Sequence, residues 1–209
     1  MFYPIKTPWW LKKLYPSLDW QPFSATERKV LYLTFDDGPH PEATPFVLEQ
    51  LRKYAARGTF FCIGKNVQQY PKIYRQILED GHRVGNHTQN HISGWKASDR
   101  NYLEDIRDAA RYIDSDLFRP PYGRITRFQS ALLQNAPLNY HIIMWDILSG
   151  DFDTSLSGAK CARNVISHAR DRSLVVFHDS EKAFPRLKEA LPAVLEHFCG
   201  LGYSLEAIR

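Results

Sequence analysis

The stretch "VLYLTFDDGPHPEATPFVLEQLRKYAA", residues 30–56, decides the fold, because it predicts one strand followed directly by one helix. Residues 30–35 are a short apolar run. Residues 41–56 begin with a Pro-Glu pair and are followed closely by a glycine, as helices commonly are. Between the two segments, Asp36 and Asp37 place two carboxylates side by side. Asp-Gly and Gly-Pro pairs are also typical of turns, so this stretch alone is compatible with a solvated turn.

The rest of the chain repeats this alternation of strand and helix. The other strands are expected at residues 59–63, 82–87, 116–119, 140–147, 173–178 and 203–208, and the other helices at 65–80, 98–113, 125–136, 158–170 and 183–199. Strands that alternate with helices in one α/β domain predict a parallel sheet. About seven such units can close into a barrel with the helices outside, and an open doubly wound sheet is the alternative.

Composition limits the class of protein. The chain of 209 residues suits one domain, and 44% hydrophobic with 24% charged residues are typical of a globular protein. The net charge of +4 comes from scattered Lys and Arg residues, so we expect no nucleic acid partner. The three cysteines form no C-x-x-C pair, which argues against a thiolate zinc site or a redox pair.

Residues 1–28 are expected to form an N-terminal extension that packs on one larger domain, residues 29–209. The extension has neither a signal-peptide pattern nor an apolar run of membrane-spanning length, so we expect a cytoplasmic or membrane-proximal protein. Trp9, Trp10 and neighbouring lysines form an aromatic and basic cluster of the kind that contacts membrane surfaces. Packing of these rings on the domain is the favoured interpretation, and membrane contact is the alternative.

Reactive side chains gather at the predicted ends of strands. They are Asp36 and Asp37 after the first strand, His87 and His91 after the third, Arg119 at the fourth, Asp146 and Asp151 near the end of the fifth, and His178 and Asp179 at the end of the sixth. The carboxyl ends of strands in a parallel barrel meet at one face, where active sites are built. We therefore expect these residues to converge, which a solvated-turn explanation does not require.

The spacing of His87 and His91 indicates a metal site. Two histidines with three residues between them can present both imidazoles to one ion. A carboxylate added to them leaves an open position, as in catalytic zinc sites. Thr88 follows His87, so the H-E-x-x-H protease motif is absent. If one aspartate binds the ion, the other is free to act as a general base, and His178 is suited to protonate a leaving group near neutral pH.

Four stretches resemble the motifs of one family. "TFDDG", "HTQNH", "RPPYG" and "VFHD", within residues 34–179, occur in the order and spacing of the polysaccharide deacetylase family, carbohydrate esterase family 4. The resemblance implies a distorted (β/α) barrel, with residues 29–209 as a deacetylase-like catalytic domain. It also implies hydrolysis of N- or O-acetyl groups on a glycan or oligosaccharide. One divalent metal ion is implied too, usually Zn²⁺, with Co²⁺ and Ni²⁺ as alternatives.

The resemblance also implies a role for individual residues. It implies Asp36 as the general base, oriented by Arg119, and His178 as the general acid. It implies Asp37, His87 and His91 as the metal ligands. It also implies the Tyr122 N–H as an oxyanion donor and Trp145 as a wall of the acetyl pocket. For Trp145, packing in the core is the alternative.

One motif departs from the family pattern. In place of W-x-x-D-x-x-D-W the chain has "WDILSGDF", so Leu148 and Phe152 replace the first Asp and the second Trp. In the family the first Asp supports the catalytic histidine. Asp146 and Asp151 are the candidates for that support here. We hypothesise that Asp146 substitutes, because strand alternation puts it on the same face as Leu148.

Two other functions fit the same residues. The site could cleave an amide or imide of a non-sugar substrate, since fold and motifs do not fix the substrate. It could also belong to a sugar-binding module that has lost turnover. Retention of Asp36 and His178 argues against such a module, because a protein that only binds sugar has no need of a base and an acid beside its ion.

Overall fold

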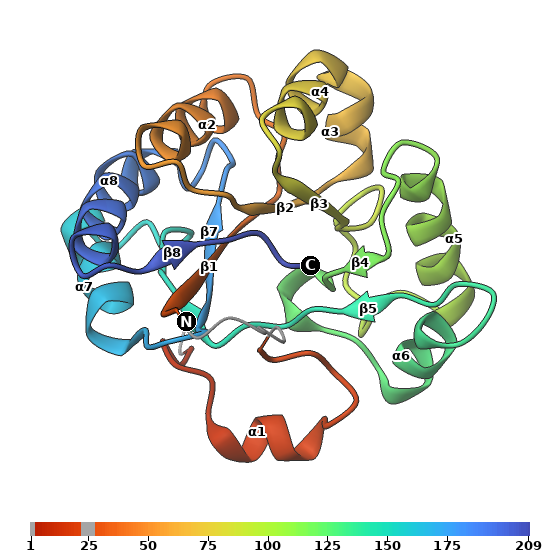
Figure 1. The fold of residues 1–209 in the computed structure, drawn as a ribbon. Coiled ribbons are helices and arrows are strands. Elements are labelled where there is room, and N and C mark those ends of the chain that lie inside the picture. Colours follow the sequence, from red (N-terminus) through yellow and green to blue (C-terminus); the bar gives the residue numbers. More distant parts are fainter. Residues whose placement is uncertain (1–2, 22–27) are drawn as a thin grey trace.

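Seven parallel strands form a curled sheet in the computed structural model, which describes residues 3–21 and 28–209 (Figure 1). Their order across the sheet is β5-β4-β3-β2-β1-β7-β6, and a short β8 pairs with the start of β1. The bounds are β1 Val30–Asp36, β2 Thr59–Cys62, β3 Arg83–Asn86, β4 Leu117–Phe118, β5 His141–Ile142, β6 Ile147–Leu148, β7 Leu174–His178 and β8 Ser204–Leu205. The predicted distorted barrel of about seven parallel strands is confirmed.

Helices surround the curled sheet on its outer side, as Figure 1 shows. Their bounds are α1 Trp9–Leu14, α2 Ala43–Lys53, α3 Gly64–Gln69, α4 Pro71–Glu79, α5 Asp99–Ala110, α6 Arg127–Gln134, α7 Gly158–His168 and α8 Phe184–Gly200, with a short 3₁₀ turn at Pro121–Gly123. Three of them start at a capping side chain, one of which is Ser157 at α7. Ser98 caps α5, and Thr126 forms a capping box with Gln129 at the start of α6.

The sequence did not predict two features of these elements. Residues 140–147 were expected to be one strand, but they contain β5 and the first residue of β6, and these two strands lie at opposite edges of the sheet. Residues 65–80 were expected to be one helix, but the chain breaks at Tyr70 and a new helix begins at Pro71. Proline disfavours a helical residue before it and suits a first helical position, which explains the break.

Strand β1 lies at the centre of the sheet and is buried along its whole length. Leu31, Leu33 and Phe35 belong to the core that packs against the helices, whereas Val30 and Tyr32 belong to a second cluster with Phe61, Leu117, Ile143, Leu174 and Ile208. Both faces of the strand are therefore buried, so its sequence is a continuous apolar run rather than an alternating one. The rigid centre of the sheet ends at Asp36.

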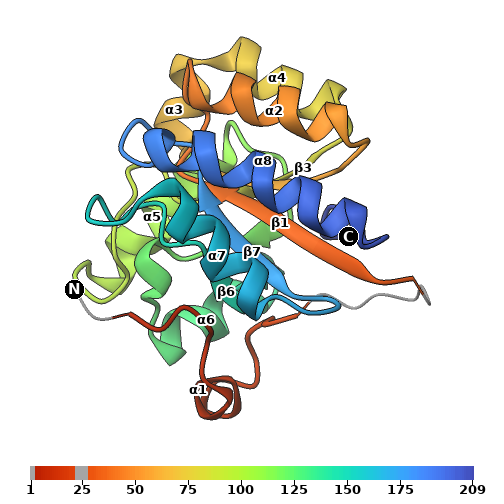
Figure 2. The same cartoon turned by 90° about the vertical axis from the view of Figure 1, so that its left-hand side faces the viewer.

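The described part of the N-terminal segment packs at the gap between the edge strands β5 and β6. Lys6 forms an antiparallel bridge with Ile147, and Asp19 forms a parallel bridge with Ile143. Figure 2 shows α1 below the body of the barrel. The expected boundary after residue 28 falls next to residues 22–27, which lie outside the described residues, and stays a prediction.

The rings of Trp9 and Trp10 on α1 are exposed, so the favoured interpretation that they pack on the domain is wrong for these two side chains. Leu11 of the same helix does pack against the core. Membrane contact through this segment stays a prediction. Of the helices described, none is both long enough and apolar enough to cross a membrane.

Candidate active site

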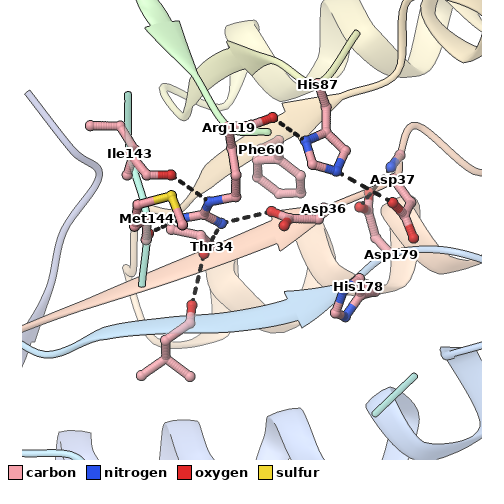
Figure 3. A network of polar contacts seen from close by, with 12 residues as sticks. Thr34, Asp36, Asp37, Phe60, His87, Arg119, Ile143, Met144, His178 and Asp179 are labelled. Atoms are coloured by element: carbon pink, nitrogen blue, oxygen red, sulfur yellow. Dashed lines mark hydrogen bonds and ion pairs between the residues drawn. The ribbon is translucent and has the colours of Figure 1, made fainter. Parts of the chain in front are cut away.

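Asp37, His87 and His91 come together at the carboxyl ends of β1 and β3. Each offers a ligand atom, and these atoms all lie within 4.8 Å of one another. Asp37 Oδ1 is 3.2 Å from His91 Nε2. The same oxygen is 3.7 Å from His87 Nε2 (Figure 3). The same oxygen is buried and accepts no hydrogen bond from the described residues.

The charge state of both histidines suits metal ligation. His87 Nδ1 donates a hydrogen bond to the Arg119 carbonyl oxygen at 2.7 Å, which leaves the lone pair on Nε2 toward Asp37. Burial, followed by the neighbouring His91, lowers the pKa of His87 to about 3. Burial also lowers the pKa of His91. Two neutral imidazoles and one carboxylate oxygen without a donor are a set that fits a divalent ion such as Zn²⁺.

Asp37 is held in place through the residue that follows it. The Gly38 N–H donates to Asp179 Oδ1 at 3.1 Å, and the Thr44 hydroxyl donates to Asp179 Oδ2 at 2.5 Å. A Cβ atom on Gly38 would overlap the Asp179 carboxylate, so only glycine fits there. Asp37 itself has a left-handed backbone, with φ of 80°. The sequence placed Asp179 at this face, directly after the predicted acid, but did not indicate its role.

The loop that carries both histidines is held by a helix. Asp105 of α5 accepts hydrogen bonds from the N–H groups of Gln89 and Asn90, at 2.9 and 3.0 Å, and from Asn90 Nδ2 at 2.6 Å. Within the same loop, Thr88 and His91 have left-handed backbones. Sequence reasoning also missed Asp105. The signal was a carboxylate on the buried, apolar face of a predicted helix.

Arg119 fixes the second aspartate of the pair. Its side chain is fully buried, and Nη1 donates to Asp36 Oδ1 at 2.7 Å and to Thr34 Oγ1 at 2.7 Å. Nε and Nη2 donate to the carbonyl oxygens of Ile143 and Met144, at 3.1 and 2.9 Å (Figure 3). The guanidinium is therefore held from several sides, and Asp36 Oδ1 is oriented by it.

His178 is paired with Asp151, which is fully buried. The His178 Nδ1–H donates to Asp151 Oδ1 at 2.8 Å, and the His178 main-chain N–H donates to Asp151 Oδ2 at 2.7 Å. Burial is the largest single effect and lowers the pKa of His178. The carboxylates of Asp151, Asp37 and Asp36, in that order, together raise the pKa by more than burial lowers it, so that it lies at about 9. The His178 ring is therefore protonated on both nitrogens at neutral pH, and its Nε2–H takes no part in the hydrogen bonds to Asp151.

The hypothesis that Asp146 supports His178 is wrong. Asp146 Oδ1 pairs with Lys12 Nζ at 2.8 Å, and Oδ2 accepts from the Ser173 hydroxyl at 2.7 Å. The Asp146 N–H donates to the carbonyl oxygen of Leu174, the first residue of β7, whereas His178 is the last. Strand alternation identified the face of Asp146 but not its level along the strand, which is the opposite end from His178.

A comparison with protein families gives the same assignment as the motifs. The family model described as "Polysaccharide deacetylase" matches residues 24–141. A peptidoglycan-N-acetylglucosamine deacetylase of Bacillus cereus is 35% identical over 182 residues, which cover 84% of each chain. This chain belongs to the polysaccharide deacetylase family. Its predicted class, a carbohydrate deacetylase, is confirmed.

Two further members of the polysaccharide deacetylase family are similar to this chain. A chitooligosaccharide deacetylase of Azorhizobium caulinodans is 31% identical over 157 residues, which cover 71% of this chain and 73% of the relative. The solved structure of the peptidoglycan deacetylase PdaC from Bacillus subtilis superposes with a TM-score of 0.78 and 29% identity. It covers 87% of this chain and 89% of that one. The deacetylase fold therefore extends well beyond the segment that the family model matches.

Two residues that the deacetylase motifs single out line the same face. Tyr122 has a left-handed backbone, with φ of 61°, and its ring centroid is 4.6 Å from that of His91. Trp145 is half-buried and packs against two core clusters. Its ring lies so near Gly123 that a Cβ atom on that residue would overlap it. The oxyanion role of the Tyr122 N–H and the pocket-wall role of Trp145 stay predictions.

Proposed function

We propose that this deacetylase hydrolyses N-acetyl groups of sugars with a divalent ion, most simply Zn²⁺, held by Asp37, His87 and His91. One observation carries the proposal. The three candidate ligands lie at the same strand ends as an aspartate fixed by Arg119 and a histidine charged by Asp151. Co²⁺ and Ni²⁺ accept the same donors. When bound, such an ion polarises a carbonyl oxygen and lowers the pKa of water.

Asp36 takes the role of general base. Arg119 holds Oδ1, so the other carboxylate oxygen can accept the proton of the water that attacks the acetyl carbon. The attack places negative charge on the carbonyl oxygen. The Tyr122 N–H, at a left-handed residue after the Pro-Pro pair, donates to no acceptor among the described residues and is suited to donate to that oxygen.

His178 takes the role of general acid. Its pKa of about 9 keeps Nε2 protonated at neutral pH, while Asp151 holds the ring by Nδ1. When the C–N bond breaks, this proton moves to the departing nitrogen, so acetate and a free amine are formed. An amine leaves readily only when it is protonated, and an acid that carries its proton at neutral pH therefore suits an N-acetyl group better than an O-acetyl group.

The names of the relatives support acetylated glycans as substrates, since two of them are named for N-acetylglucosamine and chitooligosaccharides. The substrate test is acetate release from N-acetylglucosamine oligomers and from O-acetylated xylan, with zinc-loaded wild type beside Asp36→Asn. We expect release from the N-acetylated oligomers to fall by about 10²- to 10⁴-fold in the variant, at unchanged zinc content.

Two other outcomes would select the alternatives. Release of acid from small non-sugar amides, without release from any acetylated sugar, would favour the amide or imide hydrolase. Tight binding of the oligomers by wild type, without acetate release, would favour a sugar-binding module.

A further inference from the structure

Two exposed rings and a partly buried arginine lie in a row beside the candidate metal site. We call Trp95, Tyr122 and Arg124 the aromatic-arginine ridge. The Tyr122 ring lies 4.6 Å from the His91 ring between centroids. The Arg124 guanidinium carbon lies 5.9 Å from the centroid of the Tyr122 ring and 5.4 Å from that of Trp95. The ridge therefore begins beside His91, a candidate metal ligand. From there the Tyr122 ring, the Arg124 guanidinium and the Trp95 ring follow one another.

The main chain under the ridge is rigidly held. Trp95 Nε1 donates to the Ile125 carbonyl oxygen at 3.2 Å, which fixes the indole. The Gly94 N–H donates to the Arg124 carbonyl oxygen at 3.1 Å, and the fully buried Gln129 donates to the Gly94 carbonyl oxygen at 2.9 Å. These bonds join the loop after β3 to the loop after β4, so the ridge is formed before any ligand arrives, which lowers the entropy lost on binding.

Both rings of the ridge are largely exposed. Trp95 and Tyr122 are each 62% accessible to solvent, although the Trp95 indole is fixed by its hydrogen bond. Large aromatic rings that face water beside an active site offer a flat apolar surface. The C–H face of a pyranose ring is complementary to such a surface, and a sugar bonded to the one whose acetyl group reacts would lie over it.

The charge of Arg124 is available to a ligand. The rings of Tyr122 and Trp95 contact the guanidinium through cation–π interactions, which do not use its N–H groups as hydrogen-bond donors. Within the described part of the chain, no carboxylate forms an ion pair with Arg124 and no acceptor takes a hydrogen bond from its side chain. A guanidinium fork matches the two oxygens of a carboxylate.

We propose that the aromatic-arginine ridge binds the sugar next to the one that is deacetylated, and that Arg124 pairs with a carboxylate on that sugar. This inference rests on the proposed function. It narrows the substrate class to acetylated glycans with acidic substituents near the reacting residue, and it makes Trp95 and Arg124 specificity-determining residues.

Calorimetric titration of zinc-loaded Asp36→Asn protein tests the ridge without turnover. The probes are a tetrasaccharide of N-acetylglucosamine in which alternate residues carry a lactyl ether carboxylate, and the methyl ester of the same compound. We expect the acid to bind about three- to tenfold more tightly than the ester. Adding Arg124→Gln should abolish this difference and leave the affinity for the ester unchanged. Adding Trp95→Ala should weaken both probes by a similar factor.

Two control substitutions have the same chemistry at a distance from the ridge. Trp9 is 69% exposed on α1 and contacts a cation, Lys13, as Trp95 contacts Arg124. Arg52 lies in the last turn of α2 and pairs with Asp80 at 2.8 Å. Trp9→Ala and Arg52→Gln should not change the affinity for either probe.

Equal affinity for acid and ester, or a preference that survives Arg124→Gln, would overturn the ridge proposal. Acetate release by wild type is measured separately on the same acid. A protein that prefers the acid through Arg124 but releases no acetate would contradict the proposed function and not the ridge. A protein that releases acetate without the preference would contradict the ridge alone.

Discussion

His178 keeps its proton at neutral pH because Asp151 is buried against it and accepts two hydrogen bonds from it. Replacement by Asn removes the charge but keeps the size. In Asp151→Asn the effect of burial, which lowers the pKa of His178, is opposed only by the more distant Asp36 and Asp37. We therefore expect the pKa to fall from about 9, and the fall of activity on the alkaline side to move to lower pH.

The pH dependence of kcat for acetate release measures this shift. The sign is fixed, because a general acid is lost as pH rises through its pKa, and a lower pKa moves that loss toward neutrality. An unchanged alkaline limb in Asp151→Asn, in protein that still folds, would show that Asp151 does not control the acid.

Sequence reasoning predicted which residues meet but not every residue that holds them. The convergence of Asp36, Asp37 and His178 follows from the rule that parallel strands end at one face. The roles of Asp105 and Asp179 depend on which loop N–H groups they meet. Those loops have left-handed residues, whose positions a hydrophobic pattern does not reveal.

At the scale of elements, α5 acts on the metal site through one carboxylate. Asp105→Ala would leave the N–H and Nδ2 groups of Asn90 without their acceptor and would remove one of the two acceptors of the Gln89 N–H, which loosens the loop between the candidate ligands. We expect the affinity for Zn²⁺ to fall by about 10- to 100-fold, as is usual when a group that positions a ligand is removed. Competition with a chromogenic chelator measures this affinity without any substrate.

Asp108 on the same helix is a matched control, because its carboxylate pairs with Arg111 at the surface. Asp108→Ala should bind Zn²⁺ like wild type. If Asp105→Ala and Asp108→Ala had the same affinity as wild type, the contact from α5 would be irrelevant to the metal site.

The edge strand β6 has a structural partner in the N-terminal segment. Asp146 is almost fully buried between Lys12 and Ser173, so Asp146→Ala should leave both without their acceptor. We expect the free energy of unfolding in urea to fall by about 1–3 kcal/mol, with no change in the pH dependence of activity.

Asp116 provides the control for this prediction, because its pair with Arg83 is exposed. Asp116→Ala should change the stability by less than about 0.5 kcal/mol. A shift of the alkaline limb in Asp146→Ala, like that expected for Asp151→Asn, would restore Asp146 as the support of His178.

At the scale of the whole molecule, a curled parallel sheet of about seven strands was predictable, whereas the place where the barrel opens was not. Residues 140–147 form one apolar run, and such a run has the same appearance whether it is one strand or two strands at opposite edges. The bridges of Lys6 and Asp19 to these edges join residues far apart in sequence, and no local pattern indicates them.

The central claim is that one ion, held by Asp37, His87 and His91, makes the flanking Asp36 and His178 productive. Its most direct test is acetate release from an N-acetylglucosamine oligomer while Zn²⁺ is titrated into chelator-treated protein. The account predicts negligible release without metal, a linear rise, and a plateau at about one ion per chain. His87→Ala should bind Zn²⁺ poorly and stay inactive across the same titration. Full acetate release from metal-free wild type, or a normal plateau in His87→Ala, would contradict the account.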